Sequence, residues 1–284
     1  MSDTSVVWLS RKVICNNGII EKTKYPARIP ANSTKRERKK EIARASRAAD
    51  NAERELARWL NNNFSQQEDI HLAMTYSEAG YKRLEARADK ITVEAISPEN
   101  ALIMAAQKEL ENFIRRVQYA IGSEAIRYIG ISSDLNEQGE RVRPHHHLVI
   151  NRAALAVCRE KWARMGFVLE EELFHVNGDF TALAHYLINQ VRYIPNAKRY
   201  TLSRNLTPPE KTAPVEITRY TEAEISIPTG CTLLYRTPYT RGASQYVRYI
   251  DPKAAHKPYK EIRRACERLP MPRKQSRSRS YKRL

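Results

Sequence analysis

The chain has 284 residues, 42% of them hydrophobic, so one large domain or two small ones can bury a core. Lysine and arginine outnumber aspartate and glutamate by 49 to 32, and the resulting net charge of +17 favours nucleic acid over a small metabolite as partner. We find no apolar run near the roughly 20 residues that span a bilayer and no signal-peptide pattern. We therefore expect a cytoplasmic protein without a membrane partner, and the four scattered cysteines exclude a CxxC zinc site and a disulfide framework.

Residues 1–63 predict a β-hairpin followed by a basic helix. Strand-like runs between Val6 and Tyr25 flank Asn17-Gly18, a pair that supplies the positive φ of a tight turn. From Thr34 to about Asn63 the pattern is helical, and residues 35–47 hold seven basic residues against two acids. This basic stretch is either a solvated helix face or a contact to DNA.

Residues 64–206 predict the order strand, helix, strand, strand, helix, strand, helix, which is typical of an α+β fold. The expected strands are "DIHLAMTY", "AIRYIGIS", "RPHHHLVIN" and "GFVLEEELF". The second and third are joined by a short polar stretch, so we expect them to pair antiparallel. The sequence predicts a central antiparallel sheet flanked by helices, with the histidine-rich strand in its middle.

Residues 207–270 change to prolines, threonines and short strand-like runs such as "CTLLYRT" and "SQYVRYI", which indicate a small β-rich appendage. Residues 271–284 hold six basic residues, no acid and three serines. Such a composition cannot bury a core and predicts a disordered basic tail.

Three of the seven histidines stand side by side at the start of an apolar run. Because side chains alternate along a strand, His145 and His147 are expected on one face and His146 on the other, with Leu148 and Ile150. Two imidazoles at this spacing can bind one cation when a carboxylate or water completes the shell. A polar cluster at a strand end that binds no metal is the alternative.

The segment "PHHHLVIN" resembles the HUH motif, histidine-apolar-histidine, of rolling-circle replication initiators of bacterial phages and plasmids. "HLAMTY" resembles the first motif of that family, and "YLINQ", residues Tyr186 to Gln190, resembles its tyrosine motif. The resemblance spans residues 52–249, and the ordered set is more specific than any single motif. It implies an HUH endonuclease domain, ferredoxin-like or RRM-like in fold, that nicks and rejoins single-stranded origin DNA in a bacterial host.

The resemblance implies that Tyr186 attacks DNA and keeps the 5′-phosphate, while His145 and His147 hold Mg²⁺ or Mn²⁺. A phenol with a pKa near 10 is a weak nucleophile at neutral pH, so the cation is needed to polarise the phosphate. Tyr193, seven positions further on, is a candidate second nucleophile.

Two departures from the family pattern affect the expected site. The glutamate that relatives often carry before the histidines is absent, so Asp134 is the candidate third metal ligand, with Glu140 behind it. The lysine of the family's YxxK motif is replaced by Asn189, and Arg192 or Lys198 is the candidate for its charge. The expected DNA-binding residues are Arg192, Lys198, Arg199 and Arg204.

Several alternatives remain open. No GxxxxGK[ST] phosphate loop occurs, so the host would supply the helicase and the polymerase. A conjugative relaxase would use an upstream tyrosine, with Tyr25, Tyr76 and Tyr81 as candidates, and an HUH transposase would keep the order found here. A non-catalytic nucleic-acid-binding protein is the alternative from another class.

Overall fold

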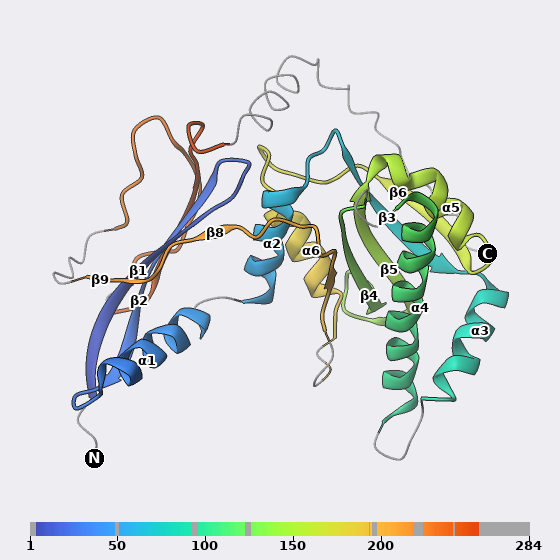
Figure 1. Ribbon diagram of the computed structural model, residues 1–284, viewed down its shortest axis with the longest axis horizontal. Coiled ribbons are helices and arrows are strands. Elements are labelled where there is room, and N and C mark those ends of the chain that lie inside the picture. The colour runs from blue at the N-terminus through green and yellow to red at the C-terminus, as the bar shows by residue number, and fades with distance from the viewer. Residues whose placement is uncertain are drawn as a thin grey trace.

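A computed structural model describes residues 4–48, 51–91, 96–122, 126–192, 194, 198–217, 224–240 and 242–255. Within these residues the chain forms two antiparallel sheets and six α-helices, which confirms the predicted α+β class (Figure 1). None of the helices described combines the length and the apolar character needed to cross a bilayer. The candidate second nucleophile Tyr193 and the predicted basic tail, residues 271–284, lie outside the described residues.

The first sheet, which we call the terminal sheet, is built from both ends of the chain. The predicted hairpin is present: β1 (Thr4–Ile14) pairs antiparallel with β2 (Ile19–Pro30), and Gly18 alone supplies the positive φ, +85°. The predicted C-terminal appendage does not form a sheet of its own. Its strands join the hairpin in the order β10-β11-β2-β1-β8, with β9 also on β1. The bounds of these strands are β8 Glu210–Lys211, β9 Val215–Glu216, β10 Thr232–Arg236 and β11 Gln245–Ile250.

The predicted helical stretch between Thr34 and Asn63 contains two helices, α1 (Lys35–Ala48) and α2 (Ala52–Asn63). Asn51 separates them because its extended backbone and its side chain, which accepts from the Arg54 N–H, cap the start of α2. Helix α1 packs on the terminal sheet, where Ile42 meets a buried cluster that includes Leu9 and Ile29. Helix α2 lies between the two sheets (Figure 1).

The second sheet, the central sheet, has the order β6-β3-β5-β4-β7 with every pair antiparallel. Its strands are β3 (Asp69–Tyr76), β4 (Tyr128–Leu135), β5 (Arg141–Asn151), β6 (Gly166–Glu171) and β7 (Thr201–Leu202). The histidine-bearing strand β5 is in the middle, as predicted. With α3 (Glu78–Ala88), α4 (Pro98–Ile121) and α5 (Leu155–Trp162), the chain order is strand, helices, strand, strand, helix, strand.

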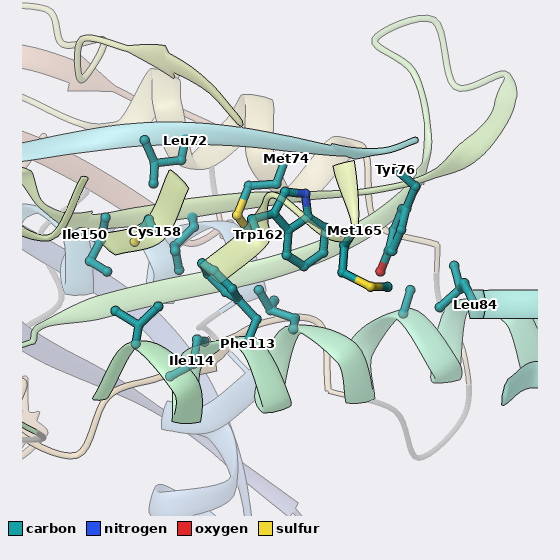
Figure 2. Close-up of a cluster of buried hydrophobic side chains, with 14 of the residues drawn as sticks. Leu72, Met74, Tyr76, Leu84, Phe113, Ile114, Ile150, Cys158, Trp162 and Met165 are labelled. Carbon is teal, nitrogen blue, oxygen red and sulfur yellow. The ribbon is translucent and has the colours of Figure 1, made fainter. Parts of the chain in front are cut away.

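One face of the central sheet packs against α3, α4 and α5 (Figure 2). Trp162 is fully buried there, with its ring 5.2 Å from those of Tyr76 and Phe113, and its Nε1–H donates to the Thr75 carbonyl. Ser97 and Pro98 mark the start of α4 as predicted. This tight aromatic packing fixes the even-numbered side chains of β3 and β5 on this face.

The other face of the central sheet packs against α2 and α6 (Thr181–Asn189). Leu56 and Leu60 of α2 and Leu183 and Leu187 of α6 are buried in one cluster with Val149 of β5. Packing on this face therefore holds α6, the helix that carries Tyr186, over the strand that carries the histidines.

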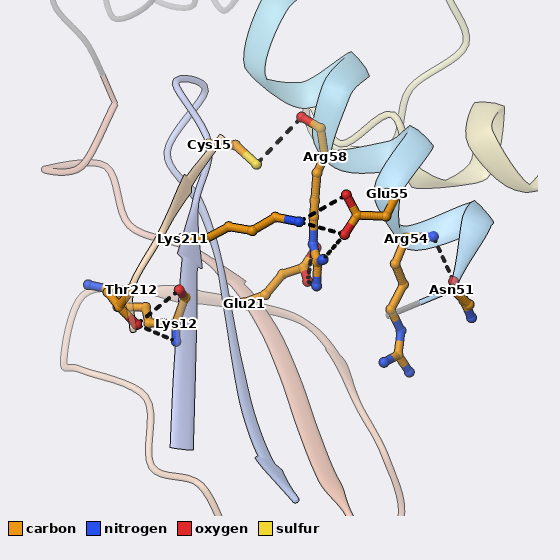
Figure 3. A network of polar contacts seen from close by, with 9 residues as sticks. All are labelled: Lys12, Cys15, Glu21, Asn51, Arg54, Glu55, Arg58, Lys211 and Thr212. Carbon is orange, nitrogen blue, oxygen red and sulfur yellow. Dashed lines mark hydrogen bonds and ion pairs between the residues drawn. The ribbon is translucent and has the colours of Figure 1, made fainter. Parts of the chain in front are cut away.

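A buried ionic network joins the terminal sheet to α2 (Figure 3). The Arg58 guanidinium, with its side chain only 1% exposed, lies 2.6 Å from Glu21 of β2 and 2.7 Å from Glu55. Lys211 of β8 reaches the same Glu55 carboxylate at 2.7 Å. Because water is excluded from Arg58 and Glu21, each charge depends on the other for compensation.

Removing one member of this pair is expected to lower the free energy of unfolding strongly, whereas removing both charges is expected to lower it little. Arg58→Met should lower the free energy of unfolding in urea by about 3–5 kcal/mol, because it leaves the Glu21 carboxylate buried without its partner. The double variant Arg58→Met/Glu21→Met should recover most of that loss. As a control, Arg159→Met removes the exposed pair with Glu170 and should cost about 1 kcal/mol or less. Equal losses in the single and double variants would contradict this interpretation.

Candidate active site on the central sheet

The faces of β5 agree with the predicted alternation. His147 lies opposite Ala73 of β3 and Ile131 of β4, on the face that α2 and α6 cover. His146 points to the other face, with Leu148 and Ile150, and is 0% exposed. The triplet therefore divides into two histidines that face α6 and one that belongs to the core.

His146 is a core residue whose two ring nitrogens both have partners. The Tyr76 hydroxyl lies 2.7 Å from Nε2 and the Ser132 hydroxyl 2.9 Å from Nδ1. Burial first, and then the nearby His145 and His147, lower the pKa of His146 to about 3. A neutral imidazole with both nitrogens hydrogen-bonded can be buried at little cost.

Helix α6 begins beside Asp179, the predicted cap residue. The Asp179 carboxylate accepts from the backbone N–H of Thr181 at 2.9 Å, although Phe180 is the residue in the capping position. Tyr186 and Gln190 are four positions apart, so both face the same side. The ring centroid of Tyr186 is 5.5 Å from that of His147 and 6.3 Å from that of His71.

The side chain of Gln190 lies between the two histidines. Its Oε1 is 3.3 Å from Nε2 of His145 and 3.2 Å from Nε2 of His147, and the residue is 3% exposed. Its Nε2 donates to the Tyr186 carbonyl at 3.4 Å. Because a carbonyl can only accept, this bond orients the amide so that its oxygen faces the histidines.

A chain of hydrogen bonds links His147 through His71 to Glu171. Nδ1 of His147 lies 3.0 Å from Nε2 of His71, and Nδ1 of His71 lies 3.1 Å from the Glu171 carboxylate. Burial and the neighbouring histidines lower the pKa of His147 to about 3, so the His147 ring is neutral. In the tautomer in which His147 Nδ1–H donates to His71, Nε2 of His147 bears a lone pair.

His145 is also oriented by a hydrogen bond at Nδ1. Its Nδ1 lies 3.2 Å from the Arg143 carbonyl, which can only accept, so Nδ1 carries a proton and Nε2 is the nitrogen that faces Gln190. Nε2 of His145 and Nε2 of His147 thus both lie within hydrogen-bond distance of Oε1 of Gln190. The three atoms are compatible with a ring N–H that donates to the amide oxygen, and equally with a cation bound by two ring nitrogens and the amide oxygen.

The two ring nitrogens and the amide oxygen are suitable ligands for a divalent cation. Two ligands about 2.1 Å from an octahedral ion and at right angles lie about 3.0 Å apart, close to the 3.2 and 3.3 Å found here. Imidazole nitrogens suit Mn²⁺ and other transition metals, while an amide oxygen and DNA phosphate oxygens also suit Mg²⁺. The third ligand of this candidate site is the amide oxygen of Gln190. Within the described ranges, no group of three histidine, cysteine, aspartate or glutamate side chains is placed to bind a metal ion.

The expected third ligand, Asp134, is engaged elsewhere. Arg192 donates to both carboxylate oxygens, from Nε at 2.9 Å and from a terminal nitrogen at 2.7 Å, and donates to Asn100 as well. No hydrogen bond or ion pair joins Asp134 to His145 or His147 in the part of the chain that is described. Asp134 and Arg192 thus satisfy each other, and the Glu140 carboxylate accepts from Asn136.

Two of the expected DNA-binding residues line a cavity of about 730 Å³ between α4 and β7. Lys198 and Arg204 share it with the aromatic rings of Tyr128 and Tyr200 and with Arg115. Arg199 is exposed but is not among the lining residues. The cavity combines positive charge with aromatic surface, the two features that bind single strands.

Sequence reasoning missed His71, Glu171 and Gln190 as site residues. His71 opens the segment matched to the first family motif, and the four-residue spacing from Tyr186 to Gln190 was a usable signal. Of the rival tyrosines, Tyr76 bonds to His146 on the opposite face, and Tyr25 is buried in the terminal sheet. Tyr81 lies under the Arg143 guanidinium, 4.5 Å from its ring centroid.

Comparison with protein-family models, with curated proteins and with solved structures gives no significant match. The function must therefore be argued from the arrangement of these residues.

We expect His71 and Glu171 to set the affinity of the site for a cation without binding it. His71→Leu removes the acceptor for His147 Nδ1–H and should weaken Mn²⁺ binding by about 10–100-fold, measured by titration calorimetry. Glu171→Gln should weaken it less, because an amide oxygen still accepts from His71. His185→Gln, an exposed histidine on α6, is the matched control and should leave the affinity unchanged. Unchanged Mn²⁺ binding in His71→Leu would show that the hydrogen bonds from His147 through His71 to Glu171 do not affect metal affinity.

Proposed function

We propose that this protein is a metal-dependent tyrosine endonuclease that nicks and rejoins single-stranded DNA at an origin and so starts rolling-circle replication. The observation that carries the proposal is the convergence of His145 Nε2, His147 Nε2 and Gln190 Oε1 near the Tyr186 ring, on one face of the central sheet. The order strand, helices, strand, strand, helix, strand, with strand order β6-β3-β5-β4, is that of the ferredoxin-like motif and supports the fold that the resemblance implies.

In the proposed reaction the Tyr186 oxygen attacks the scissile phosphorus and loses its proton. The bond from phosphorus to the 3′-oxygen breaks, the 5′-phosphate stays on Tyr186, and the departing oxygen takes up a proton to become a 3′-hydroxyl. Attack of a 3′-hydroxyl on the phosphotyrosine reverses these steps, and because one phosphodiester is exchanged for another, rejoining needs no ATP.

The chain's own residues prepare this step. Burial raises the pKa of the Tyr186 phenol, against the smaller opposing effect of the Gln190 side chain, so the phenol is protonated at neutral pH. A Mg²⁺ or Mn²⁺ ion held by His145, His147 and Gln190 would polarise the phosphate and disperse charge on the leaving oxygen. His71 and Glu171 hold the His147 ring in the orientation that turns Nε2 toward that position.

Single-stranded DNA fits the cavity at the β7 edge of the central sheet. Bases stack on aromatic rings such as Tyr128 and Tyr200, while Lys198, Arg204 and Arg115 attract the backbone. Arg192 is held by Asp134, so in this proposal its role is to brace the segment after α6. A host helicase and polymerase would open and copy the duplex.

Two related enzymes remain the alternatives. An HUH transposase shares the order of histidines before tyrosine, and the site chemistry alone does not separate it from an initiator. A relaxase would need an upstream nucleophile, and the bond from the Tyr76 hydroxyl to His146 on the far face of the sheet speaks against Tyr76 in that role. A non-catalytic DNA-binding protein would form no covalent product.

The nucleophile is tested with a library of labelled single-stranded DNA and Mn²⁺, by following the covalent product on denaturing gels. Tyr186→Phe should abolish the adduct completely, because it keeps the ring and removes only the attacking oxygen. Tyr81→Phe is the matched control and should leave the adduct unchanged. Mapping of the DNA-linked peptide by mass spectrometry to Tyr25, Tyr76 or Tyr81 would favour the relaxase instead.

The ligand set is tested with the same assay and with Mn²⁺ calorimetry. His145→Ala and His147→Ala should abolish nicking, and Gln190→Ala should weaken Mn²⁺ binding at least about tenfold. Gln190→Glu should keep or strengthen binding, because a carboxylate replaces the amide oxygen with a charged one. Asp134→Asn should leave the metal affinity within about twofold, and a larger loss there than in Gln190→Ala would restore Asp134 as third ligand.

A further inference from the structure

The terminal sheet has one face that α1 and α2 cover. Its second face is covered near Ile20, where Val247 and Tyr249 pack with Ile225, and exposes Arg28 at the other end of β2. Helices α1 and α2 cover the face that carries Leu9, Tyr25 and Ile29, and the Arg58–Glu21 ion pair is on the same side. Because side chains alternate, the other residues of β1 and β2 face away from both helices. We call this the outer face, and it points away from α2 and the central sheet (Figure 1).

Basic residues line the outer face. Lys12 of β1 lies directly opposite Lys22 of β2 in the antiparallel register, and Ser10 lies opposite Lys24. Lys12 and Lys22 have no ion pair among the described residues, while Lys22 lies 5.6 Å from the centroid of the Tyr249 ring. The outer-face basic residues on the hairpin are Lys12, Lys22, Lys24 and Arg28, and Trp8 lies among them.

The backbone register holds the two lysines opposite each other. Like charges directly across an antiparallel pair destabilise a sheet, and burial together with the charge of Lys12 lowers the pKa of Lys22. A shift of register would relieve the repulsion, but it would also turn Leu9, Tyr25 and Ile29 out of their cluster with α1. The register therefore keeps the two lysines opposite each other on the outer face, where an anion placed between them would be attracted by both.

We propose that the outer face of the terminal sheet binds the phosphodiester backbone of DNA, as a second contact outside the active site. The basic row from Lys22 to Arg28 extends about 20 Å along β2, the axial length of about six nucleotide steps. A row of this length fits a polyanion better than a single phosphate, in keeping with the net charge of +17. The inference rests on the proposed function only in that it names DNA as the nucleic acid.

The test compares two double variants with the same change in net charge. Lys12→Gln/Lys22→Gln removes the opposed pair, and Lys82→Gln/Lys90→Gln removes two exposed lysines on and just after α3. Binding to a labelled single strand and to a labelled duplex of the same sequence is measured by fluorescence anisotropy in EDTA at several salt concentrations. Thermal unfolding of each variant is measured alongside.

Loss of the opposed pair should reduce the slope of log affinity against log salt by about 1.8 for duplex or about 1.4 for single-stranded DNA, because two phosphate contacts are lost. The DNA form that shows the change identifies the bound form. The unfolding temperature should stay the same or rise, since a repulsive pair has been removed. An unchanged slope for both DNA forms, or an equal change in the control variant, would overturn the proposal.

The assay needs neither a cation nor Tyr186, so the two proposals can fail separately. A protein that loses salt-dependent binding in the Lys12→Gln/Lys22→Gln variant but never forms a covalent adduct would overturn the proposed nicking activity alone. A protein that forms the adduct and shows no change in that variant would overturn the outer-face contact alone.

Discussion

Burial of β5 on both faces is the constraint on which the rest of the site depends. His146 is fixed on one face by Tyr76, Ser132 and the Trp162 ring, while Val149 is packed under α2 and α6 on the other. A strand buried in this way cannot slip by one residue, because every side chain would change faces. The position of His145 and His147 beneath α6 is therefore determined by the packing of their neighbours and not by the histidines themselves.

The second requirement is that α6 stays at a fixed height over that strand. Its first turn is held by Asp179, which accepts from Asn61 of α2 at 3.1 Å and forms an ion pair at 3.0 Å with Arg248 of the terminal sheet. Asn61 in turn accepts from Asn17 of the β1–β2 turn. The terminal sheet, α2 and the start of α6 thus share one polar network.

The chemistry of the candidate site follows from the balance of donors and acceptors. Nδ1 of each of the two histidines is hydrogen-bonded to a neighbour: that of His145 to the Arg143 carbonyl and that of His147 to His71. The Gln190 amide nitrogen donates to the Tyr186 carbonyl. The two ring Nε2 atoms and Gln190 Oε1 lie close together, and a cation with phosphate oxygens beside it would bind all three, which is why we favour metal-assisted phosphoryl transfer.

Local patterns in the sequence were sufficient for much of this protein. The hairpin, the helix start at Ser97 and Pro98, the central position of β5 and the division of the histidine triplet all follow from residue periods and turn chemistry that act over a few positions. The pairing of β11 with β2 was out of reach, because it joins the two ends of the chain and each strand alone could have formed a separate sheet. The third ligand depended on tertiary contacts as well. Asp134 lies near the end of the strand that precedes the histidines in sequence, but its ion pair with Arg192 and the approach of Gln190 to the histidines exist only once α6 is packed on the sheet. The sequence by itself determined which elements form and which faces they bury, whereas the tertiary structure decided which polar groups meet, because hydrogen bonds and ion pairs between distant segments depend on positions that no local period specifies.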